Sequence, residues 1–360
     1  MSQLMNRRRL LKAAAGLGAL ASSGLAPLAA RASAPLVRID AHAHLIPDFY
    51  RNAVKERGVV DASGEALPNW SPGAALSFMN KFGIQSQVLS LPEPGLAFLP
   101  DLPSRVSMAR QLNEYVRDEL VFASPGTPNH RRFGGFATLP LGDPSNSKDV
   151  AAARAEATRA IHTLGLDGVV LYTSYQGTYL GDPKLAPLMQ TLNSLKAKVM
   201  VIPVAPPQAS DLSIPESILE LPFETTRVAA NMLYKLVYLL YPNICWQFSE
   251  GGGATPFLSF RSGLLALNLN PNESSYARLH FDTASASAPA TVASMRQVTD
   301  VSHIVLGTDF PFSAALYANK PAGDPNAELN QSFTSTERLL VDRDNALAQF
   351  PTLAKRLALG

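Results

Sequence analysis

Eight short apolar segments recur along the 360-residue chain, and most are separated by a stretch long enough for a helix. Each segment is rich in Val, Ile, Leu or Phe and ends near Gly, Pro, Ser, Asp or Thr, a pattern typical of a buried strand followed by a turn. The segments are residues 36–45, 84–92, 131–141, 166–174, 198–205, 243–253, 277–285 and 303–312.

Helical patterns lie between several of these segments. Residues 71–83 begin with a serine cap and a proline and end at a glycine, and the alanine-rich residues 145–165 also end at a glycine. Residues 215–241 carry apolar spacing for one or two helices. Eight strand–helix units predict an α/β fold, a single (β/α)₈ TIM-barrel domain over residues 36–360. A doubly wound open sheet is the alternative, but no glycine-rich turn follows the first strand.

The first 32 residues have a composition of their own. Arg7, Arg8 and Arg9 precede a short stretch rich in Ala, Gly and Leu, which resembles a twin-arginine export signal with cleavage after Ala32. We therefore expect a signal peptide at residues 1–32 and a periplasmic or secreted protein. A membrane anchor is disfavoured because the apolar stretch falls short of the ~20 residues that a spanning helix needs. We expect no stable membrane insertion after cleavage.

The charge of the chain depends on this segment. Five basic residues and no acidic one lie within residues 1–32, so their removal changes the net charge from +2 to −3. The remaining chain is mildly acidic, and we expect no nucleic-acid partner. The single cysteine, Cys245, lies in an apolar segment and is expected to be a buried thiol. A small-molecule substrate is the expected partner, and a homodimer stays open.

Two histidines end the first predicted strand, in RIDAHAHL. In a barrel of this kind the chemistry lies at the carboxyl ends of the strands. His42 and His44 are two residues apart, so both imidazoles lie on one face and can converge on one ion. Asp309 ends the last strand, which neighbours the first in a closed barrel. We predict that these three residues bind a divalent metal, with zinc as the first choice and manganese or iron as alternatives. The competing interpretations are a surface histidine pair and an aspartate that caps a turn.

Further polar residues end other strands or lie near them. Glu250 precedes three glycines in QFSEGGGATPF, where a buried charge is costly unless it is paired or bound. We predict that Glu250 and Asp309 are catalytic proton partners. Tyr172, Asp282 and Arg227 are candidate substrate contacts, although an arginine on a helix surface is as common as one in a site.

Three motifs carry a family resemblance: RIDAHAHLIPDFY, SEGGGATPFLSFR and HIVLGTDFPF. In this order and spacing they resemble the amidohydrolase-related superfamily of metal-dependent barrels. The closer likeness is to its decarboxylase branch, typified by the aminocarboxymuconate-semialdehyde and 6-methylsalicylate decarboxylases. The resemblance implies a metal-dependent decarboxylase or hydrolase acting on a small carboxylated, aromatic or unsaturated substrate.

The sequence departs from the pattern of that family at two positions. The resemblance implies a ligand histidine after the fifth strand and a catalytic histidine after the sixth, but this chain has Ile202 and Glu250 there. Three hypotheses stay open. Glu250 replaces the lost ligand, or the metal is held more weakly and Glu250 shuttles protons at a raised pKa. Alternatively, the barrel is a decayed enzyme or a protein that binds a small molecule without turning it over. The four other histidines do not compensate for the loss, and we interpret His280 as a core residue.

Overall fold

The structure, a computed structural model, describes residues 37–59, 61–62, 65–206, 213–267 and 275–358. The predicted export signal lies outside the described residues and stays a prediction. All described residues belong to one unit, Ser33–Gly360. No helix in the described ranges has the length and apolar character needed to cross a membrane.

Eight parallel strands form one sheet whose spatial order follows the chain. They are β1 (Arg38–His44), β4 (Ile84–Ser90), β5 (Phe133–Ala137), β6 (Gly168–Tyr172), β9 (Lys198–Ile202), β10 (Cys245–Phe248), β11 (His280–Asp282) and β12 (Ile304–Val305). The residues after β12 close the ring against β1. The Ala41 amide donates to the Leu306 carbonyl at 2.8 Å, and the His44 amide donates to the Phe310 carbonyl at 2.7 Å. Each predicted strand is present, and the (β/α)₈ barrel is confirmed.

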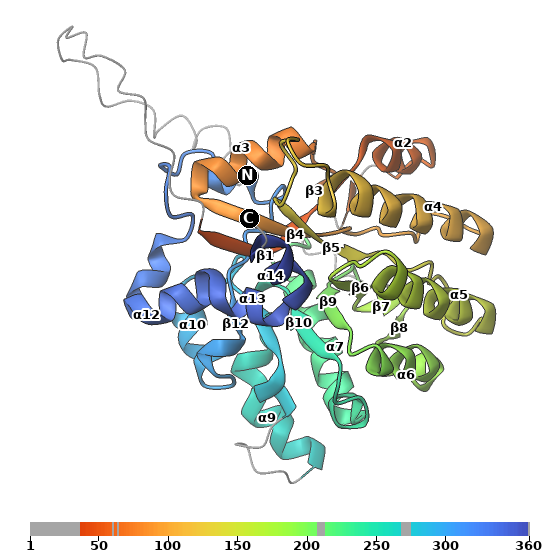
Figure 1. Cartoon of the computed structure of the whole chain (residues 1–360). Helices are drawn as coiled ribbons and strands as arrows, with labels where there is room; N and C mark the ends of the chain where they lie inside the picture. The colour runs from red at the N-terminus through yellow and green to blue at the C-terminus, as the bar shows by residue number, and fades with distance from the viewer. Residues whose placement is uncertain (1–36, 60, 63–64, 207–212, 268–274, 359–360) are drawn as a thin grey trace, which may run out of the picture. The chain divides into compact units, whose positions relative to one another are not determined.

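The helices lie around the strands (Figure 1). The α-helices are α2 (Asp48–Glu56), α3 (Pro72–Phe82), α4 (Leu102–Tyr115), α5 (Ser147–Thr158), α6 (Ala186–Ser194), α7 (Glu220–Tyr234), α8 (Val237–Leu240), α9 (Thr255–Leu267), α10 (Pro289–Arg296), α11 (Ala314–Tyr317), α12 (Ser335–Leu339), α13 (Asn345–Gln349) and α14 (Pro351–Ala358). Two short hairpins pair β2 (Asp61–Ala62) with β3 (Glu65–Ala66) and β7 (Ser174–Tyr175) with β8 (Thr178–Tyr179).

Local sequence signals account for the ends of the predicted helices. The Ser71 side chain accepts a hydrogen bond from the Ala74 amide, and α3 ends at Gly83 with a φ of 65°, the left-handed conformation that glycine adopts without strain. The alanine-rich pattern of residues 145–165 forms α5 and a π-helical turn, Arg159–Thr163. The pattern of residues 215–241 forms α7 and α8.

The two C-terminal helices lie across one end of the strand ring (Figure 1). On α14, Arg356 forms an ion pair with Asp167, which precedes β6, at 2.6 Å. On α13, Gln349 donates to the Gln247 side chain of β10 at 2.9 Å. These contacts reach the amino-terminal ends of the strands or the barrel interior, so α13 and α14 form the floor. The opposite end of the barrel, at the carboxyl ends of the strands, is not covered by these two helices.

The strands are buried on both faces, which is why they read as nearly continuous apolar segments in the sequence. All five residues of β5 and all five of β6 are buried. On β1 the buried residues alternate, with Ile39, Ala41 and Ala43 on one face. The other face carries Asp40, His42 and His44, which are at most 3% exposed. The first strand therefore directs a row of polar side chains into the barrel.

Candidate metal centre

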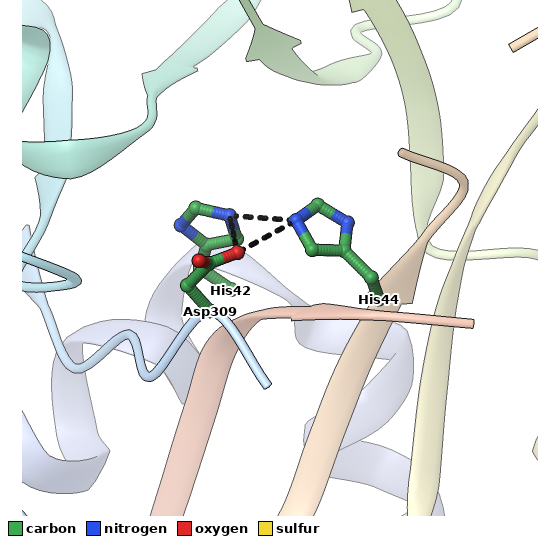
Figure 2. A group of neighbouring side chains, drawn as sticks. All are labelled: His42, His44 and Asp309. Atoms are coloured by element: carbon green, nitrogen blue, oxygen red, sulfur yellow. Dashed lines mark hydrogen bonds and ion pairs between the residues drawn. The ribbon is translucent and has the colours of Figure 1, made fainter. Parts of the chain in front are cut away.

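Two imidazoles and one carboxylate converge at the carboxyl ends of β1 and β12 (Figure 2). The Nε2 atoms of His42 and His44 lie 3.1 Å apart. The Asp309 Oδ1 atom lies 3.0 Å from the His44 Nε2 atom and 3.6 Å from the His42 Nε2 atom. Among the described residues this is the only group of three or more His, Cys, Asp or Glu side chains whose ligand atoms all lie within 4.8 Å of one another. The structure thus brings together the trio predicted from the sequence.

The Nδ1 atom of each imidazole ring points away from the cluster and lies close to a buried polar group. The His42 Nδ1 atom lies 3.1 Å from the Asp282 Oδ1 atom, an ion pair without hydrogen-bond geometry. The His44 Nδ1 atom lies 3.3 Å from the Ser90 carbonyl and 3.1 Å from the Ser90 hydroxyl. A carboxylate and a carbonyl at these positions favour the ring proton on Nδ1 and a lone pair on each Nε2, as in protein metal sites where such groups orient the histidine. This set of donors fits a divalent cation.

The backbone between β12 and α11 presents Asp309 to the cluster. The Asp309 amide donates to the His42 carbonyl at 2.9 Å, and the residue has a φ of 58°. A non-glycine residue in this left-handed conformation is strained, and such residues concentrate at functional sites. Gly307 packs just before it, where an added Cβ would lie 2.9 Å from the Cβ atoms of both His42 and Asp282. The absence of a side chain at Gly307 lets β12 approach β1 closely.

Charge in the cluster favours a bound cation. Burial alone lowers the pKa of His42, but the carboxylates of Asp282, Asp309 and Glu250 outweigh it and raise the pKa to about 10. The barrel thus gathers enough negative charge around His42 to hold a proton on it at neutral pH. A divalent cation at the two Nε2 atoms would take the place of that proton.

A cavity of about 320 Å³ opens above the cluster. Glu250 lines it, and burial and the nearby Asp309 carboxylate raise the pKa of Glu250 to about 8. Glu250 is not in the group whose ligand atoms lie within 4.8 Å of one another. This geometry favours a proton-transfer role over direct ligation. Glu250 also has a φ of 53°, and its amide donates to Asp282 at 3.0 Å.

Ile202 lines the same cavity at the end of β9 and brings no ligand atom. Phe312 lies edge-on to the His44 ring at a centroid distance of 5.6 Å. Among the lining residues that the structure describes, none is a lysine or an arginine. An anionic ligand in this cavity would therefore depend on a cation held by His42, His44 and Asp309 for its positive partner.

The structure places the three candidate substrate contacts outside the lining of this cavity. Asp282 is fully buried behind His42. Arg227 is half exposed and forms an ion pair with Glu224 on the same helix. The Tyr172 hydroxyl donates to the Leu91 carbonyl at 3.1 Å, and its ring lines a neighbouring chamber. Their roles as substrate contacts stay predictions.

The interpretation of His280 as a core residue and of Cys245 as a buried thiol is corrected by the structure, because both side chains are only partly buried. His280 lies at the start of β11, against Cys245 and His303 and away from the cluster. Sequence reasoning missed Ser90 as a partner of His44 and Phe312 as a cavity residue. Phe312 lies within the quoted HIVLGTDFPF motif, whereas the Ser90 contact depends on the register of β4 against β1.

The fold and the cluster together define a class: a closed (β/α)₈ barrel with a His-x-His pair on its first strand and an aspartate after its last. This is the arrangement of the amidohydrolase-type metal-dependent barrels. The chain belongs to the amidohydrolase family Amidohydro_2, whose pattern matches residues 39–351. The resemblance inferred from the motifs is confirmed.

Three known proteins illustrate the relationship. The decarboxylase yanB of Aspergillus niger is 33% identical over 302 residues, which cover 79% of this chain and 79% of that protein. The 6-methylsalicylic acid decarboxylase acuB of Aspergillus aculeatus is 27% identical over 345 residues, covering 90% and 99%. A crystal structure of 5-carboxyvanillate decarboxylase from Novosphingobium aromaticivorans, complexed with manganese and 4-hydroxy-3-methoxy-5-nitrobenzoic acid, has a TM-score of 0.68 at 16% identity. It covers 88% of this chain and 96% of that one, and this likeness shows the fold alone.

Proposed function

We propose that this protein is a metal-dependent decarboxylase that releases CO₂ from a small aromatic carboxylic acid. The observation that carries the proposal is the convergence of the His42, His44 and Asp309 ligand atoms in a cavity at the carboxyl ends of the strands. The named relatives are carboxy-lyases, which supports decarboxylation. Hydrolysis of a lactone or amide, the alternative that the sequence left open, has no support from them.

We propose a divalent cation as the cofactor, held by His42, His44 and Asp309. Manganese gains support from the structural relative that contains it, and zinc fits the same donors. When bound, such a cation supplies a Lewis-acidic positive charge that holds the carboxylate of the substrate. The protein contributes the orientation of both imidazoles through Asp282 and Ser90. Ile202 and Phe312 contribute apolar surface for the substrate ring.

Glu250 is the proposed proton donor. Decarboxylation breaks the bond between the ring carbon and the carboxylate carbon, and the electron pair stays on the ring carbon as CO₂ leaves. That carbon then needs a proton, and burial raises the pKa of the Glu250 carboxyl, which favours the protonated form that a proton donor needs. Glu250 gives up this proton to the ring and regains one from water, so the reaction is balanced without an oxidant or reductant.

The test is metal content and turnover measured together. Protein loaded with Mn²⁺ or Zn²⁺ is incubated with substituted salicylates and vanillates. The phenolic products that remain after loss of CO₂ are quantified by chromatography. We expect turnover that a chelator abolishes and that either ion restores.

Two variants assign the roles within the site. E250Q is expected to keep its metal and lose at least roughly 100-fold in kcat, the range found for general acids. E119Q, which alters an exposed glutamate on the helix after α4, serves as the control and should match the wild type. Folded wild-type protein that binds neither ion would contradict the proposal and favour a barrel that binds small molecules without chemistry.

A further inference from the structure

A second chamber, of about 390 Å³, lies beside the metal cavity. Both are lined by the segments that follow β4 and β9. Pro92, Ile202 and Pro203 line the metal cavity, whereas Val204 and Ala205 line the second chamber. Glu93 lines both. Glu93 is therefore part of the wall of both spaces, and its Oε1 atom accepts a hydrogen bond from the Ala205 amide at 3.1 Å.

Apolar side chains dominate the wall of the second chamber. They are Leu96, Leu99, Leu139, Leu141 and Val204. Tyr172 adds its ring, because its hydroxyl is already engaged by the Leu91 carbonyl. Such a surface gains stability when it is covered by an apolar group and offers little to an ion.

Arg105 is the one lysine or arginine among the described residues of this chamber, and its charge is already neutralised. It is 6% exposed and forms an ion pair with the fully buried Asp149 at 2.6 Å. One of its terminal nitrogens donates to the Leu99 carbonyl at 2.9 Å. Its Nε atom is buried without a partner. The chamber thus offers no free positive charge, and the other donors in its lining are uncharged groups such as those of Ser174 and Gln176.

We propose that this chamber is a distal subsite for an apolar substituent of the substrate, while the carboxylate of the same molecule lies at the metal cluster. The inference rests on the proposed decarboxylase function and specifies its substrate class. The carboxylate is kept out of the distal chamber because Arg105 is paired and because Glu93 stands at the junction. An aromatic acid with an alkyl chain or a second ring would place its carboxylate in the first space and its apolar substituent in the second, whereas a simple benzoate would occupy only the first.

The expected preference follows from apolar burial. Each methylene moved from water into an apolar pocket strengthens binding about fourfold. 2-Hydroxy-6-pentylbenzoate has four more methylenes than 2-hydroxy-6-methylbenzoate. The four methylenes set an upper limit on the order of 200-fold on the gain in binding. The chamber is open to solvent, so the alkyl chain is only partly removed from water and gains less than this limit. We expect a gain of at least about tenfold in kcat/KM.

The experiment compares these two acids on the metal-loaded protein. A97W is the test variant, because Ala97 is exposed at the chamber and a large side chain there fills the space with little risk to the core. A151W, on the exposed face of α5, is the matched control. The measured quantity is kcat/KM for the pentyl acid divided by kcat/KM for the methyl acid. We expect this ratio to fall to about 2 or less in A97W and to stay at the wild-type value in A151W.

A binding measurement separates this inference from the proposed function. Calorimetry with 3-pentylphenol and phenol, neither of which has a carboxylate, needs no turnover. Tighter binding of 3-pentylphenol that A97W abolishes would support the distal subsite even if no decarboxylation is found. Decarboxylation of both acids with equal kcat/KM, together with equal binding of both phenols, would overturn the subsite and leave the decarboxylase proposal standing.

Discussion

The replacement D282N tests whether the carboxylate behind His42 sets the metal affinity. Asp282 is fully buried, and its Oδ1 atom accepts from the amides of Glu250 and Ala284 at 3.0 and 3.1 Å. The same atom forms the ion pair with His42, and its Oδ2 atom accepts from the Gln247 amide group at 3.3 Å. An asparagine has one acceptor oxygen, so it can satisfy only one of these two sides.

The asparagine side chain of D282N can take two orientations, and the more favourable one determines how much stability the replacement costs. With its oxygen in the Oδ1 position the asparagine keeps both backbone hydrogen bonds but turns its NH₂ group toward the NH₂ group of Gln247. A buried donor that loses its acceptor costs about 1–3 kcal/mol of stability. His42 loses its ionic partner, and removal of such a partner weakens metal binding by about 10- to 100-fold. That range corresponds to about 1.4–2.7 kcal/mol of binding free energy.

The assay is competition with a chelator for Mn²⁺ and Zn²⁺, paired with thermal unfolding of the metal-free protein. D167N is the matched control, because Asp167 is also a buried carboxylate in an ion pair, with Arg356 at the barrel floor. Both variants are expected to unfold at lower temperature, but only D282N should bind metal more weakly. An unchanged metal dissociation constant in D282N would refute the idea that Asp282 positions His42.

Three further predictions concern other parts of the barrel. I202H should tighten metal binding by at least roughly tenfold, since a four-ligand zinc site supplies on the order of 10 kcal/mol in all, and I202V should not; chelator competition decides. G307A adds a Cβ atom 2.9 Å from those of His42 and Asp282. It should lower stability by about 1–3 kcal/mol and weaken metal binding, and a variant with wild-type values in both would show that β12 can move away. Burial lowers the pKa of the half-buried His280 from 6.5 to about 3, so the stability contributed by its neutral ring is complete above pH 6.5 and is lost as the pH falls toward 3. When the pH falls from 7 to 4.5, the wild type should lose up to about 2.5 kcal/mol of unfolding free energy that H280Q does not lose, as measured by urea titration. Equal losses in the two proteins would contradict this.

The strands and the convergence of His42, His44 and Asp309 were predictable from the sequence, because they follow from residue patterns within strands and from the order of the strands. Parallel strands covered on both faces produce apolar segments, and the i, i+2 spacing of His42 and His44 places both rings on one face whatever surrounds them. Asp309 followed from the closure of the barrel, which brings the residues after β12 against β1. These inferences needed the number and order of the strands but no detailed loop conformation.

The remaining features depend on how loops fold against one another. Asp282 lies behind His42 because the turn after β10 anchors the Glu250 amide to it, which strand spacing does not reveal. Arg227 turns toward Glu224, three residues earlier on α7, as readily as toward a substrate. The second chamber exists because the segments after β4 and β9 join at Glu93 and Ala205, residues 112 positions apart in the chain.

The contact between Gln349 and Gln247 fixes a direction of hydrogen bonding through the barrel. Gln349 donates to the side-chain oxygen of Gln247, and the NH₂ group of Gln247 points at Asp282. Asp282 is then left to accept from that group and to face the Nδ1 atom of His42 as a carboxylate. Together with the bond from Gln247 to the Ala41 carbonyl, these contacts form a continuous line of polar side chains from the floor of the barrel to the Nδ1 atom of His42. The position of the His42 ring, on which any metal ligation by this ring depends, is thereby linked to a residue at the opposite end of the barrel.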